Sequence, residues 1–133
     1  MKYFQRTIVV AGILLTCALL TGCPLFQPQG YTDVSVSYAY TMWDGGTFTL
    51  DVRTPAEYAI AHIPSATNID VNELQTRIGE IMAYQHQDIL VYCGSGVRSA
   101  QACEILVDNG FTQVYNMLGG LNAWINAGYP TDP

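Results

Sequence analysis

The chain has 133 residues, half of them hydrophobic, which is enough for one domain with a single modest core. Its formal net charge is −6, from eleven acidic side chains against five basic ones. A nucleic-acid-binding protein needs a basic face that neutralises phosphates, so this composition excludes nucleic acid as a partner.

The first predicted element is an export signal. Met1–Arg6 carries two cations and no anion, and residues 8–20 form an apolar run interrupted only by Thr16. The run is shorter than the ~20 residues of a membrane-spanning helix but suits the hydrophobic region of a signal peptide. It ends in Leu20-Thr21-Gly22-Cys23, which resembles the lipobox of bacterial lipoproteins and implies cleavage before Cys23 and a lipid on that cysteine. The alternatives are an ordinary signal peptide or a short N-terminal anchor with an incidental cysteine.

This interpretation divides the chain into a lipoprotein signal peptide (1–22), a lipidated tether (23–30) and a folded domain (31–133). The tether contains two prolines and a glycine, which discourage regular structure. Lys2 and Arg6 would leave with the signal, so three arginines would face all eleven acids, giving a net charge of −8. We expect an exported protein, anchored by lipid at the bacterial cell envelope and facing the periplasm. The anchor would suit contact with a membrane partner.

Helix and strand signals alternate along the folded domain. Ser35 and Asp70 are predicted to cap helices, and Glu73 stands at the capping-box position of the second. The predicted helices cover residues 36–44, 55–61, 71–81, 99–109 and 121–127, and the predicted strands cover residues 47–52, 68–69, 89–92 and 113–116. The run Ile89–Tyr92 is apolar throughout, as expected of a strand buried on both faces. The alternation predicts a parallel sheet flanked by helices, with ligands beyond the carboxyl ends of the strands.

Cys93 directly follows that apolar strand and begins a glycine-rich loop, Cys93-Gly94-Ser95-Gly96-Val97-Arg98-Ser99. Gly94 and Gly96 can adopt backbone angles closed to other residues, so successive N–H groups can point inward as an anion-binding nest. The following helix adds the positive end of its dipole. A thiol in this field has a lowered pKa and exists largely as the nucleophilic thiolate. A buried structural cysteine fits less well, because Cys93 lies after the strand, and a phosphate-binding loop lacks its Gly-Lys-Ser/Thr.

Four motifs resemble, in order, those of the rhodanese family of sulfurtransferases. They are Leu50–Tyr58, His62–Ile69, Val91–Ala100, and Asn109–Phe111 with Leu118–Trp124. The second motif departs from the family at Ser65, where glycine is usual. The likeness runs from about Tyr31 to Tyr129. It implies one rhodanese-like three-layer α/β/α domain with a central, mainly parallel sheet.

The resemblance also implies a reaction. The family's cysteine takes the outer sulfur of thiosulfate, a persulfide or a polysulfide, becomes a persulfide itself, and passes the sulfur to a thiophilic acceptor. Carried onto this chain, Cys93 is the nucleophile and Arg98 closes the loop and adds positive charge. The persulfide cradle would be formed by the backbone amides of Gly94, Ser95, Gly96, Val97, Arg98 and Ser99. No metal or organic cofactor is implied. Related arsenate reductases and cell-cycle-type phosphatases have a loop one residue longer, which argues against those activities.

Other polar residues receive structural interpretations. Asp51 and Arg53 lie at the end of the neighbouring strand, where a structural ion pair is favoured, and Arg53 is a secondary candidate for attracting an anionic donor. Glu57 is expected to be a solvated or helix-capping acid. His62, in a turn, is expected to be structural rather than a base for Cys93.

The second cysteine of the domain, Cys103, follows Cys93 by ten residues in the next helix. A helix rises ~1.5 Å per residue, so the two Cα atoms are expected to lie beyond the ~7 Å limit for a disulfide. Core packing is therefore predicted, and a resolving thiol is the alternative. Two cysteines and two histidines without paired spacing make a zinc site unfavourable.

The expected partners are a small sulfur donor, a small acceptor and the membrane, through the lipid on Cys23. The loop has no charged side chain except Arg98, and the negative domain repels anions at long range. We therefore expect thiosulfate to be a weaker donor than a persulfide or polysulfide. The alternative function is a non-catalytic rhodanese-like binding module at the membrane surface, although such members typically lack the loop cysteine. A redox role through Cys93 and Cys103 is a third hypothesis.

Overall fold

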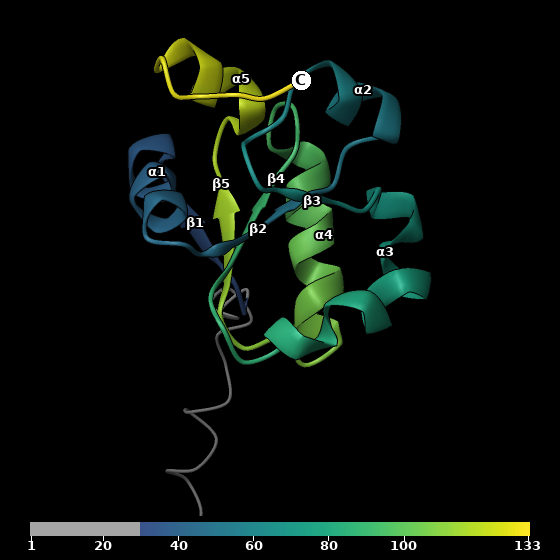
Figure 1. Cartoon of the computed structure of the whole chain (residues 1–133). Helices are drawn as coiled ribbons and strands as arrows, with labels where there is room; N and C mark the ends of the chain where they lie inside the picture. Colours follow the sequence, from purple (N-terminus) through teal and green to yellow (C-terminus); the bar gives the residue numbers. More distant parts are fainter. Residues whose placement is uncertain (1–29) are drawn as a thin grey trace, which may run out of the picture.

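The computed structural model describes residues 30–133 (Figure 1). The predicted signal peptide, the predicted lipid site at Cys23 and the tether up to residue 29 lie outside the described residues. Five strands form one sheet: β1 (Thr32–Val34), β2 (Phe48–Asp51), β3 (Thr67–Asn68), β4 (Ile89–Tyr92) and β5 (Val114–Met117). Their order is β1-β5-β4-β2-β3, and every neighbouring pair is parallel, which confirms the predicted sheet.

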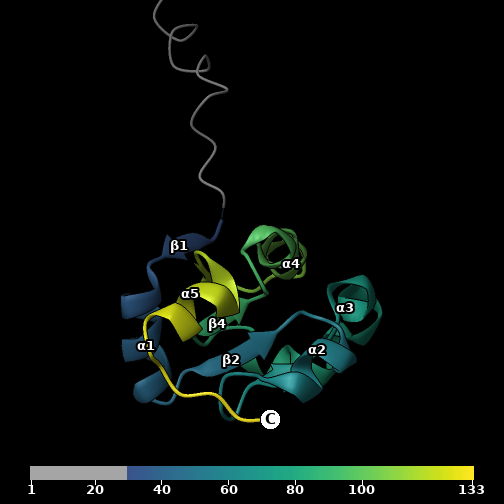
Figure 2. The same cartoon turned by 90° about the horizontal axis from the view of Figure 1, so that it is seen from above.

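Helices cover both faces of this sheet (Figure 2). One layer is formed by α1 (Val36–Asp44) and α5 (Gly120–Asn126), and the other by α3 (Val71–Arg77), the 3₁₀ helix η1 (Ile78–Tyr84) and α4 (Val97–Asp108). The short helix α2 (Pro55–Ile60) connects β2 to β3. The three-layer α/β/α prediction is therefore confirmed.

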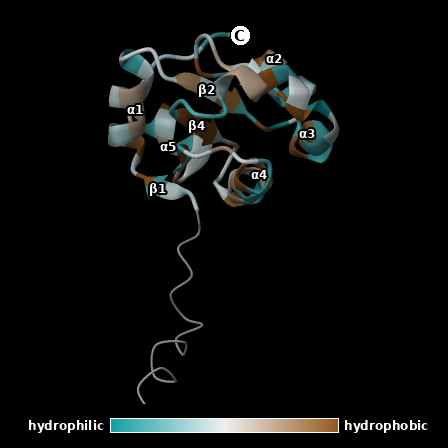
Figure 3. Cartoon of the chain, turned by 90° about the horizontal axis from the view of Figure 1, so that it is seen from below, coloured by the Kyte–Doolittle hydropathy of each residue, from teal (hydrophilic) through white to brown (hydrophobic). Residues whose placement is uncertain are grey.

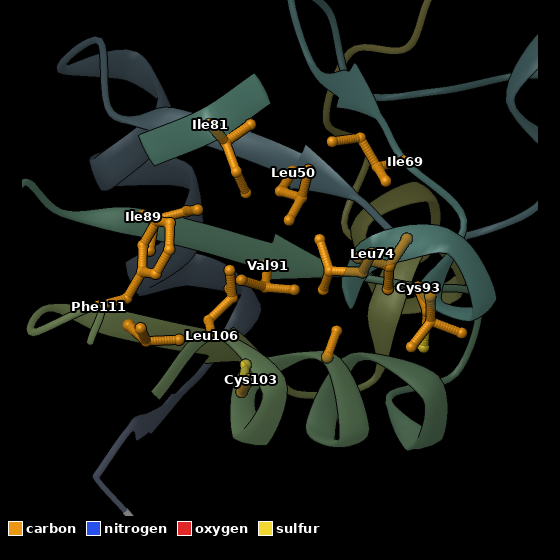
Figure 4. Packing of buried hydrophobic residues seen from close by; sticks show 14 residues of the cluster. Leu50, Ile69, Leu74, Ile81, Ile89, Val91, Cys93, Cys103, Leu106 and Phe111 are labelled. Carbon is orange, nitrogen blue, oxygen red and sulfur yellow. The ribbon is translucent and has the colours of Figure 1, made fainter. Parts of the chain in front are cut away.

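The side chains of β4 alternate between two cores. Ile89 and Val91 pack towards α3 and α4, and Leu90 and Tyr92 pack towards α1 and α5. All four are buried, as predicted for this apolar strand. Hydrophilic and hydrophobic residues both occur along the surrounding helices, as expected of amphipathic helices (Figure 3). Cys103 lies in the first core with Leu106 and Phe111, which confirms the predicted packing role (Figure 4).

The helix ends follow the expected capping chemistry in part. The Ser35 hydroxyl accepts from the Tyr38 N–H at 3.2 Å, as predicted. The Asp70 carboxylate accepts from the Asn72 N–H, but Glu73 binds Arg77 and completes no capping box. The helix predicted over 71–81 ends at Arg77 and continues as η1, which contains Gly79, a residue that destabilises an α-helix.

Two features of the fold lie outside the sequence-based predictions. The edge strand β1 was not predicted, because it has three residues and exposes two of them. The helix α4 begins at Val97, two residues before the predicted start, with Gly96 as its N-cap. Within residues 30–133, no helix is long and apolar enough to cross a membrane.

Candidate active site

Cys93 lies at the carboxyl end of β4, where the chain turns into α4 (Figure 4). Its side chain points to the core between the sheet and α4, and the residue is 0% exposed. The residues that follow it reach the surface, with Val97 78% exposed. The thiol therefore lies at the base of the loop that begins with it.

Hydrogen bonds from the loop converge on the Cys93 sulfur. The Gly96 N–H donates to Sγ at 3.0 Å, and the Cys93 thiol donates to the Ser99 hydroxyl oxygen at 3.5 Å. That hydroxyl donates in turn to the Gly96 carbonyl at 3.1 Å. Gly96 has φ 109°, a backbone conformation that is strained for any residue with a side chain. This conformation places one N–H on the sulfur and starts the helix at the next residue.

The two cysteines of the described chain are both fully buried and free, yet their pKa values shift in opposite directions. Burial alone raises the pKa of a thiol, and for Cys103 it does so strongly. For Cys93 the effect of burial is outweighed by a hydrogen bond with the Ser99 side chain and by those from the amides of Ser99, Gly96 and Ser95. Its pKa is lower than that of an ordinary cysteine. The difference comes from the loop, which supplies donors only to Cys93.

Backbone N–H groups in the first turn of α5 bind the carbonyl groups at the start of the loop. The Leu121 N–H donates to the Cys93 carbonyl at 2.8 Å, and the Asn122 N–H donates to the Gly94 carbonyl at 3.1 Å. In a trans peptide the carbonyl and the next N–H point in opposite directions. The hydrogen bond from α5 to the Gly94 carbonyl therefore turns the Ser95 N–H away from α5. On that side the Ser95 N–H contributes to the lowered pKa of Cys93.

Gly120 makes this close approach possible. A Cβ atom at this position would lie 2.5 Å from the carbonyl oxygens of Cys93 and Gly94, a distance at which atoms must move apart. Its φ of 59° also lies in the left-handed region that favours glycine. The sequence contained the Leu118–Trp124 motif, but its spacing gave no sign that it supports the loop.

Arg98 is paired rather than free. Its guanidinium donates to both carboxylate oxygens of Glu57, at 2.8 and 2.9 Å. It also lies against the first loop residue, because a Cβ atom built on Gly94 would be 3.3 Å from one of its terminal nitrogens. The hydrogen bonds from Arg98, with further ones from Thr54, lower the pKa of Glu57 to about 2 against the opposing effect of burial. The positive charge expected beside the thiol thus has a carboxylate next to it.

Glu57 therefore has two roles, of which the sequence indicated one. It completes a capping box with Thr54 at the start of α2, as a helix-capping acid does. It also links α2 to the loop 41 residues further along the chain. No local pattern shows such a contact, because it depends on the fold bringing α2 beside α4.

Asp51 and Arg53 form a buried ion pair, 2.6 Å between the closest atoms, with exposed fractions of 0% and 5%. The Tyr92 hydroxyl donates to Asp51 at 2.6 Å, and Arg53 also donates to the Ala61 carbonyl. Successive side chains of a strand point to opposite faces, and Tyr92 packs in the core opposite that of Cys93. The geometry favours the structural ion pair over the donor-attracting role of Arg53.

His62 also has structural partners. Its Nδ1 lies 2.9 Å from the Tyr58 carbonyl, its ring stacks on the Tyr58 ring, and its backbone pairs with Asp132. Among residues 30–133, no three side chains of His, Cys, Asp or Glu come together in an arrangement that could hold a metal ion.

Comparisons with known proteins identify the family of this fold. The family model of the rhodanese-like domain matches residues 35–127. The chain is 41% identical over 81 residues to a sulfurtransferase of Allochromatium vinosum, covering 61% of this chain and 74% of the relative. It is 40% identical over 72 residues to the thiosulfate sulfurtransferase PspE of Escherichia coli, covering 54% of this chain and 68% of the relative.

A solved structure gives the same result. A rhodanese-related protein from Thermoplasma volcanium superposes with a TM-score of 0.69 at 30% identity, covering 77% of this chain and 98% of that one. The family match runs from α1 to α5, and two relatives carry the name sulfurtransferase. The chain belongs to the rhodanese-like domain family, within the sulfurtransferases.

Proposed function

We propose that this protein transfers sulfane sulfur from a donor to a thiophilic acceptor through a persulfide on Cys93. The observation that carries the proposal is the contrast between its two buried thiols. Cys103 has no loop around it and a raised pKa, whereas Cys93 receives N–H donors and has a lowered one. A low thiol pKa favours the thiolate, which is the nucleophilic form.

In the first step the Cys93 thiolate attacks the outer sulfur of the donor. A new S–S bond forms, the donor's own S–S bond breaks, and its electron pair leaves with sulfite or with a thiolate. The persulfide anion on Cys93 is then stabilised by the loop amides that already face the thiol. In the second step a cyanide ion or a thiolate attacks the terminal sulfur, and the Cys93 thiolate is released.

The choice of donor follows from charge. The relative PspE is named for thiosulfate, which makes thiosulfate the first donor to assay. In this chain, however, Arg98 is paired with Glu57 and the domain is strongly acidic, both of which disfavour thiosulfate, a compact dianion, more than a persulfide, which carries one charge on its sulfur. We propose that a persulfide or polysulfide is the better donor. Steady-state kinetics with both classes tests this, and a KM for thiosulfate well below that for glutathione persulfide would count against it.

Mass spectrometry of the purified protein tests the function itself. After incubation with thiosulfate, glutathione persulfide or polysulfide, the peptide that contains Cys93 should gain one sulfur atom and lose it again on addition of cyanide. Cys93→Ser should gain none, and Cys103→Ser should behave as the unaltered protein does. If no donor loads sulfur on Cys93, the alternative function as a binding module is preferred.

We further propose that the protein is exported and anchored at the bacterial cell envelope through lipid on Cys23. The support is the basic start, the apolar run and the terminal Leu20–Cys23 tetrapeptide. Expression in a bacterium followed by membrane fractionation tests the anchor. Cys23→Ser should move the protein from the membrane fraction to the soluble one, and equal membrane association of both forms would contradict the lipid site.

A further inference from the structure

The start of α2 holds the Glu57 carboxylate in place independently of Arg98. One of its carboxylate oxygens accepts from the Thr54 N–H at 2.9 Å and from the Thr54 hydroxyl at 3.0 Å, at the start of α2. The same oxygen and its neighbour receive the two hydrogen bonds from Arg98. A carboxylate fixed from its own helix loses little further freedom on pairing, so the contact is better ordered than an isolated surface ion pair.

The pairing with Glu57 offsets the positive charge that Arg98 places beside the loop. Among residues 30–133 each of the three arginines is bound to an acid: Arg53 to Asp51, Arg77 to Glu73 and Glu80, and Arg98 to Glu57. This part of the chain contains no lysine. An anionic donor that approaches Cys93 therefore meets no unpaired Lys or Arg side chain from the described residues.

Two exposed apolar side chains belong to segments that meet at the loop. Val97 in the loop is 78% exposed, and Leu118, which precedes α5, is 49% exposed. The two segments are adjacent, because a Cβ atom built on Gly96 would lie 3.5 Å from the Gly119 nitrogen. A donor that carries an organic group on its sulfane sulfur can bury apolar surface here, and thiosulfate has none to bury.

We propose that Glu57 is a specificity-determining residue: by neutralising Arg98 it makes Cys93 select organic sulfane donors over the thiosulfate dianion. The inference rests on the proposed sulfur transfer at Cys93. Glu57 does not touch the thiol in this arrangement and acts through Arg98 on the charge that a reactant meets. Removing its charge should free Arg98 to attract anions.

The substitution Glu57→Gln tests this with little change in structure, since the amide oxygen can still accept from Thr54 and Arg98. The matched control is Glu80→Gln. Glu80 also makes two hydrogen bonds to one arginine, Arg77, at 2.7 and 3.0 Å. It lies in η1, which leads into the start of β4 rather than its end. Both variants change the net charge equally, but only one changes it beside the loop.

The first readout is alkylation of Cys93 by iodoacetate and by iodoacetamide, which differ in charge and little in size. A change in thiol pKa affects both rates alike, so their ratio reports the field that the reagent meets. In Glu57→Gln the iodoacetate-to-iodoacetamide ratio should rise about three- to tenfold at low salt. It should not change in Glu80→Gln. Glu57→Asp, which keeps the charge, should restore most of the original ratio.

The second readout is kcat/KM for thiosulfate relative to benzyl persulfide, a donor with an apolar group and one negative charge fewer. This ratio should rise in Glu57→Gln by a similar factor. An unchanged alkylation ratio, or an equal rise in Glu80→Gln, overturns the proposal. If the alkylation ratio rises but the donor ratio does not, Glu57 controls the field without controlling donor choice, and the proposal is wrong. If no donor loads sulfur on Cys93 in any variant, the proposed function fails, while alkylation still reports the effect of Glu57 on the field.

Discussion

Gly120 offers a direct test of how the first turn of α5 orients the amides around Cys93. Gly120→Ala would place a methyl group 2.5 Å from the carbonyl oxygens of Cys93 and Gly94, so the loop or the helix must shift. Overpacking of this kind costs about 1–3 kcal/mol. Placing alanine at a φ of 59° adds about 1–2 kcal/mol. The free energy of unfolding should therefore fall by about 2–5 kcal/mol if both costs are met in full.

The control for the backbone cost is Gly128→Ala. Gly128 follows the same helix, has φ 79°, and has open space where a Cβ atom would go. In Gly128→Ala the free energy of unfolding should fall only by the backbone cost, about 1–2 kcal/mol. Urea denaturation of both variants gives the difference, and that difference measures the clash with the loop.

The same pair of variants tests the effect on the thiol. If the loop shifts to relieve the clash in Gly120→Ala, the amides no longer converge on Cys93 and burial dominates, so its pKa should rise. The alkylation rate as a function of pH measures this directly. Equal unfolding free energies and equal pH profiles for Gly120→Ala and Gly128→Ala would refute the reasoning.

Three further predictions concern other contacts of the fold. Because the pKa of Glu57 falls from 4.5 to about 2 on folding, the protein should lose stability as the pH drops from about 4.5 to about 2. Denaturation should show a smaller loss in that window for Glu57→Gln, and an equal loss would exclude the carboxylate as its source. Cys103→Ser should cost about 1–3 kcal/mol, because it buries a hydroxyl in an apolar core, without changing sulfur loading. Lost loading at unchanged stability would favour the redox role. Tyr92→Phe should cost about 1–3 kcal/mol in the same assay, because it leaves the buried Ile63 N–H without its acceptor. A cost near zero would contradict that account.

Local patterns in the sequence predicted most of the fold. The apolar run Ile89–Tyr92 and the glycine that ends α4 are signals that neighbouring residues carry by themselves, and both lie where they were predicted. The Cys93 loop was equally readable, because its glycines, its thiol and the following helix are consecutive. The edge strand β1 carried no such signal, since it is short and half exposed and is recognisable only through its pairing with β5.

The surroundings of the loop could not be predicted in the same way. The contact between Arg98 and Glu57 joins residues 41 apart, and the hydrogen bonds from Leu121 and Asn122 to the loop join residues 28 apart. Both depend on the order of strands in the sheet, which sets which helices meet at its carboxyl edge. These contacts also change the chemistry that the loop sequence alone suggests. The first places the Glu57 carboxylate beside Arg98, and the second orients the Ser95 N–H towards Cys93.

The parallel sheet has one more consequence, which concerns orientation. The chain enters the domain through β1 at the amino ends of the strands, whereas Cys93 lies at their carboxyl ends. Seven residues, 24–30, extend at most about 25 Å, and a domain of this size is about 30 Å across. A lipid on Cys23 would therefore hold the domain by its base, with the thiol directed away from the bilayer. Sulfur compounds dissolved in the surrounding fluid would approach the loop around Cys93 directly, whereas a membrane-embedded acceptor would need to project beyond the whole domain.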